Sequence, residues 1–132
     1  MGATVKLIVE NSLRVLEDGY AFDIRLNWYR SLPLSSVDVL DVKLDGKQVS
    51  ADQIFFEINH HSYPLKELVE RFEELWFVQD HARLHVHQPG KIHNGESHTI
   101  ETEISLRFPY MPIGPEKFLT IATRYASGQI AQ

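Results

Sequence analysis

Hydrophobic and polar residues alternate along much of this chain, a pattern typical of β-strands with one buried and one solvated face. The alternation is clear from Ile100 to Phe108 and longest from Tyr20 to Tyr29. Shorter stretches with the same period recur between turn signals spaced about 8–12 residues apart, which predicts about seven to nine short strands. The expected fold is therefore all-β, an antiparallel β-sandwich of immunoglobulin-like outline, with a jelly roll as the alternative.

Two glycines mark hairpin turns in this pattern. Asp45-Gly46 is a strong signal for a type I′ turn, and Gly19 after Glu17-Asp18 is expected to supply a positive φ in an earlier hairpin. One segment has helical spacing instead, since its apolar residues fall at i, i+3, i+4 and i+7: Leu65, Leu68, Val69 and Phe72. The fold therefore has one short amphipathic helix that leans on the sheet.

The segment that follows the strand 100–108 is apolar but unusual. Pro109 is expected to end the strand's hydrogen-bond ladder, because proline has no N–H to donate. Pro109, Pro112 and Pro115 then stiffen the chain in an extended form. Such a segment loses little entropy on binding, so it either docks against another chain or lies on its own core as a connector.

Length and composition set further bounds. The 132 residues predict one domain, 1–132, with residues 126–132 as a loose tail. There is no cysteine, the formal charge is −5, and no basic run suggests nucleic-acid binding. No apolar stretch approaches the length of a membrane span, and the N-terminus does not resemble a signal peptide. A cytoplasmic protein is expected, with neither a membrane nor a nucleic acid as partner.

The chain is rich in histidine, which raises the question of a metal site. His85 and His87 are two residues apart on a predicted strand, so both side chains lie on one face. Imidazoles at this spacing are weak candidates for two ligands of one metal, with His81, His93 or His98 as the third. The alternative is a solvated face that happens to carry histidines.

Other catalytic patterns are weaker. The Ser–His neighbours His61-Ser62 and Ser97-His98 would face opposite ways on a strand, and there is no nucleophile elbow. Glu101 and Glu103 share a strand face, as ordinary exposed carboxylates do. We therefore expect no catalytic residue in this chain.

Aromatic residues end the two best strands. Alternation places Trp28 inward and Tyr29 outward, and tyrosine, methionine and arginine are enriched at interface centres. An exposed aromatic ring also suits a carbohydrate-binding module that stacks a sugar. The third interpretation is that these rings close the ends of the core.

Three segments resemble one known family when taken in order. They are Trp28–Ser35 (WYRSLPLS), Val42–Val49 (VKLDGKQV) and Leu106–Pro112 (LRFPYMP), within a similarity that runs from about Leu13 to Gly114. In these segments the chain resembles the small (β) subunit of bacterial C-glycoside deglycosidases.

The resemblance implies a division of labour between two chains. It implies that a TIM-barrel α subunit holds a divalent metal, usually manganese, and the acid/base residues. The complex is expected to be a lyase that cleaves the carbon–carbon bond between a 3-oxo-glucosyl unit and a flavonoid or similar phenolic aglycone. This chain would be its non-catalytic accessory subunit, without a cofactor of its own, in a hetero-oligomer that binds a 3-oxo-C-glucoside at or near the complex.

The resemblance also directs attention to particular residues. If the chain is an accessory subunit, the residues expected at the contact with the α subunit are Tyr29, Arg30, Pro33, Tyr110, Met111 and Pro112. The alternative function is a stand-alone carbohydrate-binding β-sandwich module, which should bind sugar without a partner. A small metal enzyme built on His85 and His87 is a third class.

Overall fold

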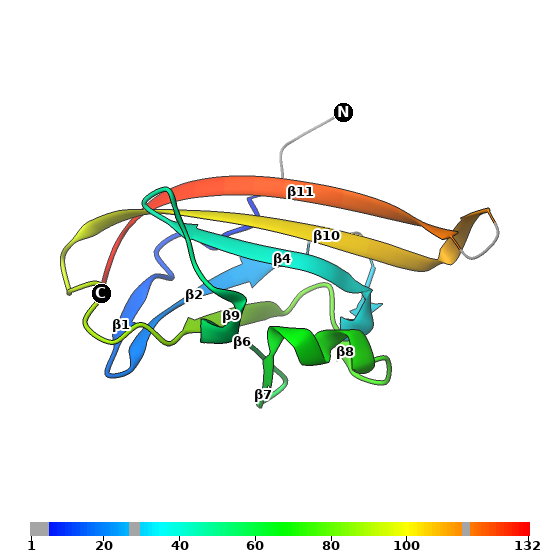
Figure 1. Cartoon of the computed structure of the whole chain (residues 1–132), viewed down its shortest axis with the longest axis horizontal. Helices are drawn as coiled ribbons and strands as arrows, with labels where there is room; N and C mark the ends of the chain where they lie inside the picture. Colours follow the sequence, from blue (N-terminus) through cyan, green and yellow to red (C-terminus); the bar gives the residue numbers. More distant parts are fainter. Residues whose placement is uncertain (1–5, 27–29, 115–116) are drawn as a thin grey trace.

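Two antiparallel sheets lie face to face in the structure, a computed structural model (Figure 1). It describes the backbone of residues 6–26, 30–114 and 117–132, and the side chains of these residues except 109–114 and 117–118. The expected antiparallel β-sandwich is confirmed.

The five-stranded sheet has the order β1-β2-β9-β6-β7 and the four-stranded sheet the order β11-β10-β4-β5, while β3 and β8 form a separate short pair. The first sheet consists of β1 (Arg14–Leu16), β2 (Gly19–Arg25), β9 (His81–Val86), β6 (Ile54–Ile58) and β7 (His61–Pro64). The second consists of β11 (Lys117–Ile130), β10 (Ser97–Gly114), β4 (Val37–Leu44) and β5 (Lys47–Gln48), and the short pair of β3 (Leu32–Pro33) and β8 (Leu75–Trp76). Three short 3₁₀ helices complete the described elements: η1 (Leu34–Ser36), η2 (Ala51–Gln53) and η3 (Leu65–Glu70).

The core lies between the two sheets and follows the alternation in the sequence. Phe22, Phe56 and Leu84 come from the five-stranded sheet, and Ile104 and Phe108 come from β10; none of these side chains is exposed. Burial of each such side chain stabilises the fold by about 1.5–3 kcal/mol. The alternate residues of the same strands point outward and are mostly polar.

The hairpin between β4 and β5 has the predicted turn. Asp45 and Gly46 have φ angles of 51° and 84°, as a type I′ turn requires. The Asp45 carboxylate also accepts a hydrogen bond from the Thr99 N–H at 2.8 Å. The turn is thus attached to the start of β10.

The prediction that Pro109 ends the strand is wrong. β10 continues to Gly114 and remains paired with β11, although the register shifts between Phe108 and Pro112 and again before Gly114. The partner on the other side, β4, is paired only as far as Leu106. Beyond that point one side of β10 has no neighbouring strand in the described sheet, so a missing N–H is tolerated there.

The expected loose tail is also wrong. Residues up to Ile130 belong to β11, and the side chain of Gln129 is buried at 5% exposure. Its Oε1 accepts hydrogen bonds from the Ser12 and Leu13 N–H groups at 3.1 and 2.9 Å, and its Nε2 donates to the Val9 carbonyl at 2.9 Å. These contacts, more than 100 residues apart in sequence, hold the C-terminal strand against the N-terminal segment.

The predicted amphipathic helix is a short 3₁₀ helix. In η3 Leu68 is buried, but Val69 is 58% exposed, and Phe72, which follows the helix, is 68% exposed, so the apolar face does not pack on the core as expected. A 3₁₀ helix has three residues per turn, which takes Val69 off the face that Leu68 presents, and the helix ends before it reaches Phe72. None of the helices among the described residues is long and apolar enough to cross a membrane.

Replacing Gly19 by alanine should strongly destabilise the protein. A Cβ at Gly19 would lie 1.8 Å from the Val86 carbonyl oxygen and 2.7 Å from the Gln88 nitrogen, where its φ is +154°. Since both contacts are with backbone, relief requires β9 to move, and we expect a loss of more than about 2 kcal/mol in the free energy of unfolding. Urea unfolding measures it.

The matched control is Gly128→Ala in β11, where a Cβ meets nothing within 4 Å. Its effect should stay within about 0.5 kcal/mol. Equal stability of the two variants would contradict the close approach at Gly19.

Candidate functional site

One end of the molecule is built from two segments that lie side by side, 30–36 and 71–78. β3 pairs with β8, so that Leu32 is opposite Trp76 and Pro33 is opposite Leu75. The Leu34 N–H donates to the Glu74 carbonyl at 2.9 Å. This end lies below the projecting end of β10 and β11 (Figure 1).

Trp76 anchors this end to the core. Its side chain is 1% exposed, its Nε1–H donates to the Asp80 carbonyl at 2.9 Å, and its ring meets Phe56 edge to face with centroids 5.3 Å apart. Leu32 and Leu34 are buried beside it in the same core. A surface carried by these segments is therefore preorganised, and a partner would meet it without first ordering the backbone.

Exposed apolar side chains gather along the segment 69–78, which we call the apolar segment. Of the eight large hydrophobic side chains that are exposed among the described residues, five belong to it. They are Val69, Phe72, Leu75, Phe77 and Val78. Apolar groups concentrated in this way usually mark an interaction site, because water solvates them poorly.

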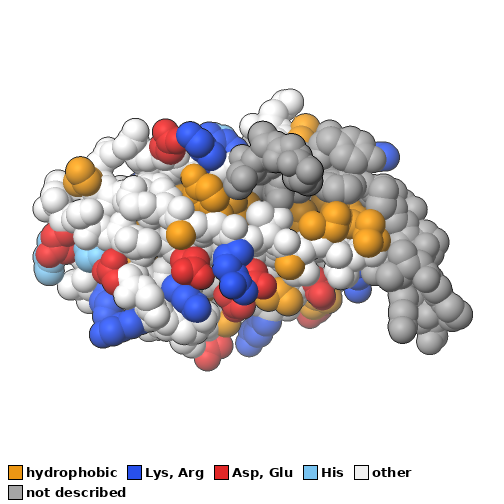
Figure 2. All heavy atoms as spheres, turned by 90° about the horizontal axis from the view of Figure 1, so that it is seen from above, with side chains coloured by type: hydrophobic (Ala, Val, Ile, Leu, Met, Phe, Trp, Pro, Cys, Tyr) orange, Lys and Arg blue, Asp and Glu red, His pale blue; other side chains and the backbone are white. Residues whose placement is uncertain are grey.

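The strand β10 extends beyond the sandwich at the same end. The Arg107 guanidinium donates to the Ser35 carbonyl at 3.4 Å, which attaches β10 to the segment 30–36 just where β4 stops. From there β10 continues with β11 to the pair Gly114–Lys117. Seen from above, hydrophobic side chains gather toward this end, and charged side chains lie nearer the middle of the face (Figure 2).

The predicted interface residues are placed unequally by the structure. Arg30 is exposed, and Pro33 is partly buried opposite Leu75. Tyr110, Met111 and Pro112 lie on the projecting part of β10, where the described structure covers the backbone but not these side chains. Tyr29 lies outside the described residues. The interface assignment thus stays a prediction. Arg30, Pro33 and the backbone of Tyr110, Met111 and Pro112 lie at the same end of the molecule.

Sequence reasoning missed the apolar segment. The helical spacing from Leu65 to Phe72 was interpreted as a helix that faces the core. A signal was available, because Trp76, Phe77 and Val78 are consecutive and a strand cannot turn three neighbouring side chains inward.

The histidines form separate groups. His85 and His87 lie together, but the expected third histidine does not join them; among the described residues the third ligand atom within 4.8 Å comes from Asp18. His98 lies instead between the carboxylates of Asp45, at 2.7 Å, and Glu96, at 3.0 Å.

Two of these histidines have raised pKa values. Hydrogen bonding to Asp45, followed by Glu96, raises the pKa of His98 despite partial burial. For His85 burial lowers the pKa, but hydrogen bonds to the carboxylates of Asp18 and Glu57 outweigh it, so the net shift is upward. Both imidazoles are thus held where a positive charge is favoured.

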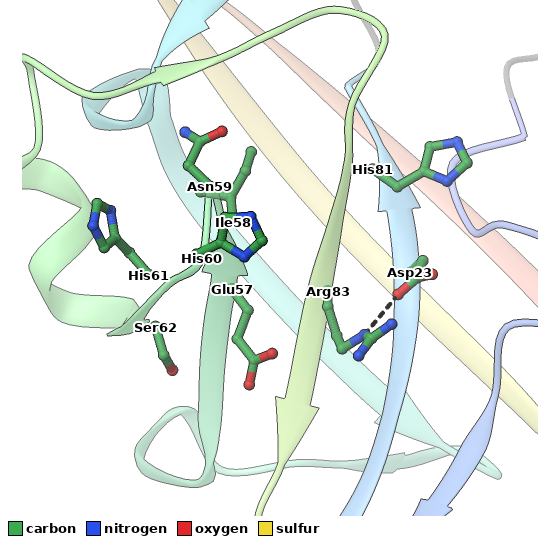
Figure 3. A pocket seen from close by; sticks show the side chains of 9 residues that line it. All are labelled: Asp23, Glu57, Ile58, Asn59, His60, His61, Ser62, His81 and Arg83. Atoms are coloured by element: carbon green, nitrogen blue, oxygen red, sulfur yellow. Dashed lines mark hydrogen bonds and ion pairs between the residues drawn. The ribbon is translucent and has the colours of Figure 1, made fainter.

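A polar pocket of about 510 Å³ lies on the outer face of the five-stranded sheet (Figure 3). Asn59 and His60 line it from the β6–β7 turn and His61 from the start of β7, while Arg83 and His81 come from β9. The Arg83 Nε–H donates to Asp23 at 3.2 Å across its floor. No Phe, Tyr or Trp is among its described lining residues, so it offers none of the aromatic stacking expected of a sugar-binding module.

The fold places the chain among small antiparallel β-sandwich proteins. A family model described as the C-glycoside deglycosidase beta subunit matches residues 4–110, so the chain belongs to this family. The 3'-dehydrocarminate deglycosidase beta subunit of a Microbacterium species is 36% identical over 108 residues, which cover 82% of this chain and 80% of the relative. A C-glycoside deglycosidase beta subunit of Arthrobacter globiformis is 32% identical over 113 residues, which cover 86% of each chain.

The contact of His98 with Asp45 should make stability depend on pH. Because the pKa of His98 is raised in the folded state, its contribution is fully present below the unfolded value of about 6.5 and is lost as the pH rises through the folded value. The loss of stability caused by His98→Gln should therefore be larger at about pH 5.5 than at about pH 8.5. Urea unfolding of both proteins at the two pH values measures it, and an equal loss at both would contradict the assignment.

Proposed function

We propose that this chain is the accessory β subunit of a heteromeric C-glycoside deglycosidase, bound to a larger α subunit that carries the chemistry. Family membership supports the subunit role, since the related proteins are named as beta subunits. The apolar segment beside the projecting end of β10 carries the proposal, because a chain that acted alone would gain nothing from exposing it.

The proposed contact combines the apolar segment, the neighbouring residues Arg30 and Pro33, and the part of β10 that holds Tyr110, Met111 and Pro112. A stable interface buries about 800 Å² on each partner. Trp76 holds this end on the core, so little ordering entropy opposes binding. Arg30 adds a charged group that pairs well with carboxylates at the rim of an interface.

The proposed chemistry belongs to the α subunit, which we expect to be a TIM barrel that holds a divalent metal such as manganese. The substrate class is a 3-oxo-C-glucoside of a flavonoid or similar phenolic aglycone. Its keto group acidifies the neighbouring C–H, so that a base removes this proton and elimination breaks the bond to the aglycone carbon, which is then protonated. The complex would thus be a carbon–carbon lyase, and the β subunit would act by binding and ordering the α subunit.

The interface is tested by substitutions at the apolar end. Phe77→Ser, and Tyr110→Ala combined with Met111→Ala, should each weaken binding of the co-expressed α subunit by about tenfold or more, because the few side chains that dominate an interface cluster at its centre and each cost about 2 kcal/mol or more when truncated. Size-exclusion chromatography with light scattering measures assembly, and each fraction is assayed on a 3-oxo-C-glucoside.

Ile130→Ser is the matched control. Ile130 is 61% exposed and also apolar, but it pairs with Ser97 at the opposite end of the β10–β11 hairpin. Assembly should not change in this variant. Unaltered assembly of the apolar-end variants would contradict the interface, and activity of the isolated chain would contradict the accessory role.

A further inference from the structure

Three metal-binding side chains converge at the end of the molecule opposite the apolar segment. His85 is near the end of β9 and His87 follows it on the same face, while Asp18 lies in the turn between β1 and β2. One ligand atom from each residue lies within 4.8 Å of the other two. Asp18 and His87 are about half exposed, so an ion can reach them from solvent.

The backbone fixes this arrangement. β2 and β9 are paired so that Tyr20 is opposite Val86, which brings the turn that precedes β2 to the end of β9. Gly19 allows that turn to approach the Val86 carbonyl more closely than any other residue would permit. The His87 N–H donates to the Gln53 carbonyl at 2.8 Å and thereby holds the chain after β9.

The side chains are also oriented for binding. The Nδ1 atom of His85 lies 3.0 Å from a Glu57 carboxylate oxygen, and its Nε2 atom lies 2.9 Å from Asp18. A carboxylate that holds one imidazole nitrogen fixes the tautomer that presents the other to a metal. The ring of His87 is held between Phe55 and His85, with centroid distances of 4.6 and 4.7 Å.

We propose that Asp18, His85 and His87 bind one divalent transition-metal ion of the zinc class. Two imidazole nitrogens and one carboxylate oxygen form a ligand set that binds such ions in preference to calcium or magnesium, which favour oxygen ligands alone. Metal–ligand bonds of about 2.0–2.2 Å separate neighbouring ligands of a tetrahedral site by about 3.3 Å. Asp18 Oδ1 lies 2.9 Å from His85 Nε2 and Asp18 Oδ2 lies 3.6 Å from His87 Nε2, and one ligand atom of each residue lies within 4.8 Å of the other two, so side-chain rotations are needed to bring the three to this spacing.

The ion would connect parts of the sheet that are distant in sequence. Asp18 belongs to the β1–β2 turn, and the histidines belong to β9 and the residue after it. Glu57 and Phe55 belong to β6 and contact the imidazoles, so the ion would also be linked to this strand. Three protein ligands leave a fourth position for water. The site therefore acts as a clamp that stabilises this end of the five-stranded sheet when metal is bound.

The same contacts have a simpler interpretation, in which a protonated His85 pairs with Asp18 and Glu57. The two interpretations differ in what His87 does. An ion-pair triad needs only one imidazole, whereas a metal site needs both nitrogens and loses the ion when either is removed.

The test uses the full chain, free of any affinity tag and treated with chelator. Cobalt(II) added to the protein should give the visible absorption bands of a four-coordinate site, and zinc should abolish them by competition. Zinc at about 100 times its Kd should raise Tm by several degrees, since it binds only the folded state. His87→Ala and Asp18→Asn change exposed side chains, so they should fold but lose both signals.

Two further variants make the test specific. Glu57→Gln should weaken cobalt binding by about 10–100-fold without abolishing it, because Glu57 orients His85 and does not bind the metal. His98→Gln is the matched control, since His98 also lies between two carboxylates but is not part of the cluster; it should bind cobalt as the unaltered chain does. Absence of cobalt bands and of a zinc-dependent Tm shift would overturn the proposal, as would signals that persist in His87→Ala.

Discussion

The contact between the inner faces of the two sheets is the constraint on which the rest of the structure depends. β10 contributes Ile104 and Phe108 to it, and the opposite sheet contributes Phe22, Phe56 and Leu84, all removed from water. Each strand therefore has an inward set of residues that packing determines and an outward set that packing leaves free. A slip of one residue in any strand would exchange the two sets, so the register of the whole sandwich is specified by this burial. Hydrogen bonds from the backbone to Gln129 and to Asp45 then attach the C-terminal strand and the β4–β5 turn to the sandwich that core packing has specified.

The candidate functional groups consequently lie outside the region where the two sheets pack against each other. The apolar segment lies at one end of the sandwich, where β8 pairs with β3 and Trp76 is buried, and the end of β10 extends past its last pair with β4. The exposed side chains of the apolar segment are attached to the core through Trp76 without contributing to it. This explains how exposed apolar groups can be rigid, since Trp76 and Leu32 supply the stability that Phe77 and Val78 do not. A rigid apolar surface of this kind suits a permanent partner better than a transient one, because permanent interfaces are more hydrophobic.

The parts of the fold that could be predicted are those in which a local rule and burial agree. Alternation from Ile100 to Phe108 and the Asp45-Gly46 turn are examples, because a period of two and a pair of positive φ angles each have few alternatives. The prediction of a core-facing helix from Leu65 to Phe72 was wrong, because helical spacing shows which residues are apolar but not whether they face a core or a partner. The prediction that Pro109 ends the strand was wrong, because the cost of a missing N–H depends on whether a neighbouring strand is there to accept it. The pairing of β10 with β4 ends at Leu106 and Val37, before Pro109 is reached. The position of Asp18 beside His85 was beyond prediction, since the two residues are 67 apart in sequence and only the pairing of β2 with β9 brings them together.

The two candidate sites lie at opposite ends of the molecule, which determines how their roles can be separated. The cluster of Asp18 and His87 is next to the turn that begins β2, whereas the apolar segment and the end of β10 lie at the far end of the sandwich (Figure 1). Residues this far apart with no shared contacts usually contribute independently to stability. A substitution at the histidines that alters assembly would therefore have to act through the sheet that connects them, and β9, which carries His85 and pairs with both β2 and β6, is the element through which it would pass. Because the described residues of the two sites share no contact, such coupling should be small, and each site can be assigned its function from its own variants.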